Sequence, residues 1–131
     1  MANVVLTRPQ SAAAGVPGTI VTGVLIPFAL GSNIVNVDSI PCENNVSVKW
    51  IYTLMNAAQD KVLTVEVLAA HRLGGPASHN RYSAVGDRSF FPHRIDVIVT
   101  GGNIVLEITN LSNGTSMIDY IANVVRIQTL I

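Results

Sequence analysis

The strongest constraint on the fold of this chain is an alternation of apolar and polar residues with a period of two. A half-buried β-strand has this period because successive side chains point to opposite faces of a sheet. In "NVSVKWIYTLM", the apolar residues on one face are Val46, Val48, Trp50, Tyr52 and Leu54. "KVLTVEVLAAH" repeats the pattern with Leu63, Val65, Val67 and Ala69. No segment shows sustained helical periodicity, so the pattern predicts an all-β protein.

Further strands are predicted on both sides of this pair. In "RIDVIVTGGNIVLEITN" two alternating runs flank Gly101 and Gly102, which favours a β-hairpin. We expect earlier strands at residues 19–26 and 33–38, and a long loop at 72–94 with a short strand near 82–85. The closing "YIANVVRIQTLI" has one apolar face, formed by Ile121, Val125, Ile127 and Ile131. About eight strands predict an antiparallel, jelly-roll-like β-sandwich.

The N-terminal third is poor in charge, with no Asp, Glu, Lys or Arg between Arg8 and Asp38. Glycines and prolines interrupt this stretch too often for a membrane-spanning helix, and "TIVTGVL" is rich in β-branched residues that favour a strand. A strand that is apolar on both faces is normally covered on both. One cover is the domain's own core, and the other is expected from a neighbouring chain.

Composition also favours an assembly subunit. The chain has 131 residues, of which 12% are charged, against about 25% in an average soluble domain. Large apolar areas left on a folded domain usually mark a contact with a partner, so we expect a homo-oligomer. The net charge is zero, which disfavours direct nucleic-acid binding. We expect one domain, with an arm at residues 1–18 and a β-sandwich at 19–131.

No catalytic, cofactor or metal site is predicted. His71, His79 and His93, with Asp87 or Asp96, have ligand chemistry, but their spacing matches no established metal site. The serines between residues 78 and 89 and the single cysteine, Cys42, lack the strand-turn-helix context of a nucleophile elbow. We therefore expect a protein that is not an enzyme, and Cys42 is expected to be a small buried residue.

Two segments carry interface candidates. Arginine and aromatic residues, the types that anchor protein interfaces, concentrate in the segment 72–94. That segment is alternatively a plain solvated loop, or a contact for a glycan or a nucleic acid. In the arm, residues 4–7 are predicted to add as a strand to a neighbouring sheet. The interface candidates are Val4, Val5, Leu6, Arg81, Tyr82, Arg88, Phe90 and Phe91. Glu66 is either solvated or paired with Lys49 or Arg126.

From residue 46 to 128 the chain resembles a family of small β-sandwich domains in the structural proteins of tailed bacteriophages. The resemblance rests on a Lys-Trp strand, an "EVLAAH" strand, the "GGN" hairpin followed by "LEITN", and a terminal "VVRI". Its residues are Lys49, Trp50, Glu66, Val67, Leu68, Ala69, His71, Gly101, Gly102, Asn103, Leu106, Thr109, Asn110, Val124, Arg126 and Ile127. Such domains occur at the ends of tail fibres and as small virion proteins.

The resemblance implies a virion component with no catalytic residues. It also favours a trimer, because related phage domains commonly assemble in threes. We expect a self-associating protein that decorates or cements the capsid surface and contacts another virion protein, such as the major capsid protein. A tail-fibre, neck or baseplate accessory protein is the first alternative, and a module that recognises a host-surface glycan is the second. The absence of heptads and shaft repeats from the sequence favours a structural subunit over a recognition module at a fibre tip. Among structural subunits, capsid decoration and a neck or baseplate accessory suit the sequence about equally, and we choose decoration.

Overall fold

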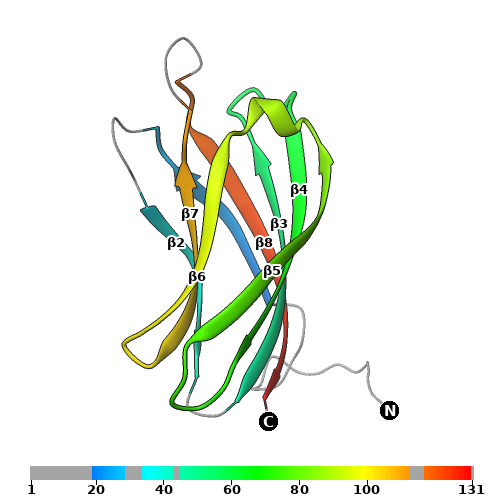
Figure 1. Ribbon diagram of the computed structural model, residues 1–131. Coiled ribbons are helices and arrows are strands. Elements are labelled where there is room, and N and C mark those ends of the chain that lie inside the picture. Colours follow the sequence, from blue (N-terminus) through cyan, green and yellow to red (C-terminus); the bar gives the residue numbers. More distant parts are fainter. Residues whose placement is uncertain (1–18, 29–33, 43–44, 113–116, 131) are drawn as a thin grey trace.

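The computed structural model describes residues 19–28, 34–42, 45–112 and 117–130, and these form two antiparallel sheets packed face to face (Figure 1). The larger sheet contains five strands in the order β1-β8-β3-β4-β5, and the smaller contains three in the order β2-β7-β6. The strands are β1 (Thr19–Ile26), β2 (Ile34–Pro41), β3 (Val46–Met55), β4 (Val62–His71), β5 (Ala77–Gly86), β6 (His93–Thr100), β7 (Asn103–Asn110) and β8 (Tyr120–Leu130). A short 3-10 helix, η1 (Arg88–Phe90), lies between β5 and β6.

This architecture confirms the predicted all-β sandwich and its eight strands. The chain changes sheets four times, between β1 and β2, β2 and β3, β5 and β6, and β7 and β8. Those crossings give the sandwich its jelly-roll-like character. In contrast, β3, β4 and β5 follow one another as a meander within the larger sheet. The predicted arm of residues 1–18, with Val4, Val5 and Leu6, lies outside the described residues.

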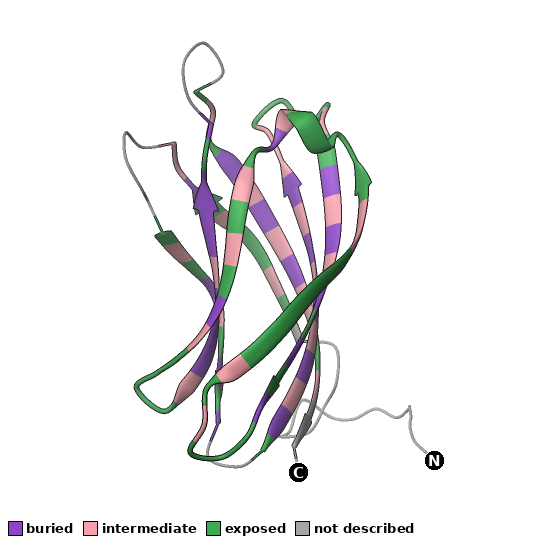
Figure 2. Cartoon of the chain, viewed as in Figure 1, coloured by how far each residue is buried: buried purple, intermediate pink, exposed green. Residues whose placement is uncertain are grey.

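The core lies between the sheets and follows the predicted alternation. Residues of β3 and β4 are alternately buried and partly exposed (Figure 2), and Trp50 is completely buried, as expected. In the hairpin, Ile104, Leu106 and Ile108 of β7 are buried, and Gly101 and Gly102 adopt the positive φ angles that their turn requires. Cys42 is a buried free cysteine. No helix in the described ranges is long and apolar enough to cross a membrane.

The apolar face predicted for β8 points away from the core. Ile121, Val125 and Ile127 share a face, but it is the outer one, and Ile131 lies outside the described residues. The inner face carries Tyr120, Ala122 and Val124, all buried. The reason is register, because Val124 pairs with Tyr52 and Ala122 pairs with Leu54, and both of those residues face the core.

The long loop predicted at 72–94 is wrong over most of its length, although the short strand predicted near 82–85 lies within β5. Residues of this segment form β5, a ten-residue strand, which is followed by η1. Strand alternation is not visible in its sequence because β5 is an edge strand with few buried residues, and because its register shifts opposite Glu66 and Val67. The shift leaves Tyr82 without a partner residue on β4, so Arg81 and Ala84 both occupy the inner face.

A polar network and an aromatic cluster join the two sheets. Asp38 of β2 accepts a hydrogen bond from the Trp50 indole N–H at 2.8 Å and pairs with Arg126 at 3.1 Å. Farther along the sandwich, Phe91 is buried with its ring 5.2 Å from that of Tyr120, whose hydroxyl donates to the Pro92 carbonyl. The polar network lies beneath β8, and the aromatic cluster lies beneath η1. The network therefore supports the surface over β8, and the cluster supports the surface beside η1.

Candidate functional site

The outer face of the larger sheet carries two apolar rows across β1, β8 and β3. The polar pair Thr53 and Asn123 lies between the rows. Ile20 pairs with Val125, which pairs with Ile51, and Leu25 pairs with Ile121, which pairs with Met55. We call the surface formed by these residues and Ile127 the outer apolar face. Its most exposed members are Ile20 at 65%, Leu25 at 55% and Ile127 at 43% exposure.

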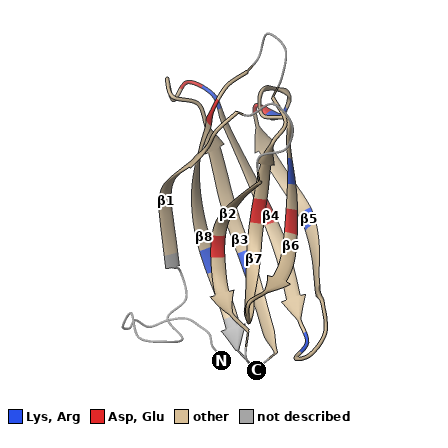
Figure 3. Ribbon diagram, turned by 90° about the vertical axis from the view of Figure 1, so that its left-hand side faces the viewer, with Lys and Arg blue, Asp and Glu red and all other residues tan. Residues whose placement is uncertain are grey.

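A bulge in β1 allows this strand to present apolar residues on both faces. Its register shifts between Val21 and Val24, where Gly23 has a φ of +68° and donates its N–H to the Asn123 side chain at 2.8 Å. On the inner side, Val21, Val24 and Ile26 pack against the core. β1 is also uncharged throughout (Figure 3). The apolar strand predicted at residues 19–26 thus has one face in the core and one at the surface.

The charges next to the outer apolar face neutralise each other. Lys49 of β3 lies 3.3 Å from Glu66 of β4, which resolves the alternatives for Glu66 in favour of this pair. The Lys49 ammonium also lies 6.0 Å from the centre of the Tyr82 ring. Hydrogen bonds with Tyr82 and Glu66 raise the pKa of Lys49 above its ordinary value. This part of the surface therefore presents one paired acid and base and no net charge.

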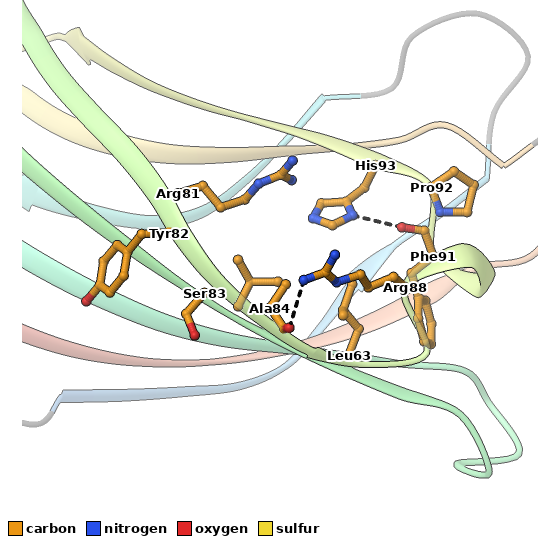
Figure 4. Close-up of a pocket in the computed structure, with 10 residues that line it drawn as sticks. Leu63, Arg81, Tyr82, Ser83, Ala84, Arg88, Phe91, Pro92 and His93 are labelled. Atoms are coloured by element: carbon orange, nitrogen blue, oxygen red, sulfur yellow. Dashed lines mark hydrogen bonds between the residues drawn. The ribbon is translucent and has the colours of Figure 1, made fainter.

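A second surface feature is a hollow at the opposite edge of the larger sheet, where β5 approaches β6 of the smaller sheet. We call it the arginine hollow; its volume is about 380 Å³ (Figure 4). Leu63, Val65 and Phe91 contribute apolar groups, and Arg81 and Arg88 contribute cations. None of the described residues that line it is acidic.

Tyr52 and His93 connect the hollow to the core. The His93 Nδ1 atom lies 2.8 Å from the Phe91 carbonyl, so it carries the proton and donates, and Nε2 accepts from the Tyr52 hydroxyl at 2.7 Å. Burial lowers the pKa of His93, with Arg81 adding to the effect, and the imidazole is therefore neutral at neutral pH. Burial raises the pKa of Tyr52 to about 12, although a hydrogen bond from Arg81 opposes the rise.

The predicted interface residues of the segment 72–94 do not form one surface. Arg81, Tyr82 and Arg88 all line the arginine hollow, but the Tyr82 ring extends away from His93 and Arg88 (Figure 4). The Tyr82 ring lies near the Lys49 ammonium. Phe90 is half-buried, with Lys61 near its ring. Phe91 is only 1% exposed and belongs to the core, so its side chain does not contribute to the surface.

The three histidines lie in three different environments. His71 is buried at the end of β4, His79 is exposed on β5, and His93 bonds Tyr52. In the part of the chain that the structure describes, no three His, Cys, Asp or Glu residues form a group that could hold a metal ion.

The residues missed from the sequence are those of the outer apolar face and the pair Tyr52–His93. A signal existed for the first group, because the continuous apolar character of residues 19–26 indicated a strand covered on both sides. No local signal predicted the second, since Tyr52 and His93 lie 41 residues apart and meet only through the packing of two sheets.

Neither protein-family models nor curated proteins match this chain in sequence. Among solved structures, the chain is similar to the tailspike protein of Acinetobacter baumannii phage AM24, with a TM-score of 0.47 and 7% sequence identity. The similarity covers 86% of this chain and 26% of the tailspike. At this level of similarity, neither the role nor the partners of the tailspike extend to this chain.

Proposed function

We propose that this chain is a non-enzymatic structural subunit of a tailed-bacteriophage particle that assembles with copies of itself through the outer apolar face. The single observation that carries the proposal is the apolar surface across β1, β8 and β3. Contiguous apolar surface is costly in a free monomer and usually marks an interface. The placement in a phage particle is supported by the sequence resemblance over residues 46–128.

A second copy is the partner that suits the charge of this face. Beside the apolar rows, Lys49 and Glu66 already pair with each other, and at the end of the rows the exposed Asp119 carboxylate accepts a hydrogen bond from the Phe28 N–H. Two copies that meet over the rows leave Asp119 at the rim and bury no unpaired charge, which would cost several kcal/mol. Among the described strands, β1 is the outermost of its sheet. We favour a trimer, the assembly that the resemblance implies.

Within the particle, we propose that the assembled sandwich decorates or cements the capsid surface, with the major capsid protein as its neighbour. The alternative positions are the tail fibre, neck or baseplate. Labelling the protein and imaging the particle would distinguish these positions, and a label on the tail would contradict the decoration proposal.

Charge substitutions test self-association. We expect Ile20→Lys together with Leu25→Lys to convert the oligomer to a monomer of 13.9 kDa in size exclusion with light scattering. Leu73→Lys is the matched control, because Leu73 is 62% exposed but lies in the turn between β4 and β5. An unchanged mass for the double variant, or equal loss of mass for the control, would contradict the proposal.

A further inference from the structure

The arginine hollow contains two cations with neutral partners. Arg88 donates to the Ala84 carbonyl at 3.2 Å, and Arg81 lies near the neutral side chains of Tyr52 and His93. In the described part of the chain neither forms an ion pair, whereas Arg126 is paired with Asp38 and Lys49 with Glu66. Both arginines come from exposed positions. An anionic ligand can therefore bind these two cations without displacing a carboxylate of the protein.

The hollow is also organised before any ligand arrives. The register shift around Tyr82 turns Arg81 inward, opposite Val67, and η1 places Arg88 on another side of the same space (Figure 4). The Tyr52 hydroxyl donates a hydrogen bond to His93, so both of these neutral side chains are fixed beside Arg81. The bulge limits the directions in which the Arg81 side chain can point. A pre-positioned guanidinium loses less conformational entropy when it binds an anion.

The shape and the remaining lining suggest the size and class of the ligand. Ligand pockets usually measure about 300–1,000 Å³, so a hollow of about 380 Å³ suits a small ring rather than a large cofactor. Pro92, which is exposed, and Ala84, which is half-buried, offer apolar groups for the C–H face of such a ring. The planar fork of arginine matches a carboxylate, which it binds through two parallel hydrogen bonds.

We propose that the arginine hollow binds a saccharide unit that carries a carboxylate. Arg81 and Arg88 hold the carboxylate, and the apolar groups beneath them receive the sugar ring. This site lies on a different surface from the outer apolar face, across β4 and β5. Loss of one function therefore does not entail loss of the other.

Glucuronate is the probe for this proposal, with glucose and inorganic phosphate as comparisons. Titrations followed by nuclear magnetic resonance of the full chain should show saturable shifts at Arg81, Arg88 and His93 with glucuronate, none with glucose, and weaker binding of phosphate. Arg81→Gln and Arg88→Gln should each weaken glucuronate binding by about tenfold, as expected for loss of a charge-assisted contact. Arg94→Gln is the matched control, since Arg94 is exposed on β6 outside the hollow.

Four outcomes would overturn the proposal. They are the absence of saturable glucuronate binding, equal binding of glucose, phosphate binding as tight as that of glucuronate, and equal weakening by Arg94→Gln. Thermal unfolding of each variant separates loss of binding from loss of fold, and Arg88→Gln keeps the test decisive if Arg81→Gln does not fold. The association test with Ile20 and Leu25 variants is independent of all these results.

Discussion

The outer apolar face and the arginine hollow occupy opposite edges of one five-stranded sheet. They differ in the free energy of their exposure to water. Ile20 and Leu25 expose hydrocarbon, which is unfavourable until another surface covers it. Arg81 and Arg88 are exposed cations that water solvates well until a ligand replaces it. The first surface therefore favours permanent assembly, and the second favours reversible binding of a small anion.

The two surfaces also differ in how they connect to the core. Beneath β8, the outer apolar face is backed by the network of Asp38, Trp50 and Arg126. The arginine hollow shares Phe91 directly with the core. Substitutions in these two supports can therefore show which surface depends more on the stability of the sandwich.

The largest effect is expected from Phe91→Ala. Removing a fully buried phenylalanine leaves a cavity, and such changes lower the free energy of unfolding by about 3–5 kcal/mol. Denaturant unfolding measures the loss, with Phe90→Ala as the control, because the Phe90 side chain is only half-buried. If both variants lost equal stability, Phe91 would not be the support of the hollow.

A smaller loss is expected from Asp38→Ala. The substitution leaves the Trp50 indole N–H and the Arg126 guanidinium without their acceptor, and both groups are largely buried. Because the pair keeps some contact with solvent, we expect a loss of about 2–3 kcal/mol in the free energy of unfolding. Asp96→Ala is the matched control on β6, where the carboxylate is exposed. Equal stability of the two variants would contradict the role of Asp38 in joining the sheets.

The smallest effect concerns pH. Burial lowers the pKa of His93 below 6.5 in the folded protein, so the unfolded chain binds the proton more readily. His93 therefore contributes stability that is fully present above pH 6.5 and is lost as the pH falls through the folded pKa. Melting temperatures measured over this range should fall less steeply for His93→Gln than for the unchanged chain. Parallel curves would show that His93 is not buried in its neutral form.

The sequence predicts the structure well where the alternation within a single strand shows which of its faces is buried. Alternation in residues 46–55 and 62–71 predicted both the strands and the faces that they bury, and Gly101 and Gly102 predicted the hairpin. The sequence predicts the structure less well where the direction of a side chain depends on how its strand pairs with a neighbouring strand. The outward direction of Val125 depends on its register with β3, and the inward direction of Arg81 depends on a bulge opposite β4. Neither can be deduced from the order of residues in one strand.

The dependence on strand pairing also explains why part of the outer apolar face was predicted from the sequence and the arginine hollow was not. The apolar character of residues 19–26 predicted a surface covered by a neighbour, because eight consecutive residues carried the signal. The arginines of the segment 72–94 were identified as functional candidates, but the hollow itself was not. It requires β4, β5, η1 and β6 to meet, and its residues extend from Leu63 to His93.

Covalent footprinting of side chains tests the central claim most directly, namely that another copy covers the outer apolar face. Ile20 and Leu73 are exposed to nearly the same extent in the single chain, at 65% and 62%. A carbene reagent followed by mass spectrometry reports the solvent exposure of both residues in one sample. We predict that Leu73 is labelled far more strongly than Ile20 in the assembled protein, and that the difference shrinks on dilution to monomer. Equal labelling of Ile20 and Leu73 in the undiluted protein would contradict the account.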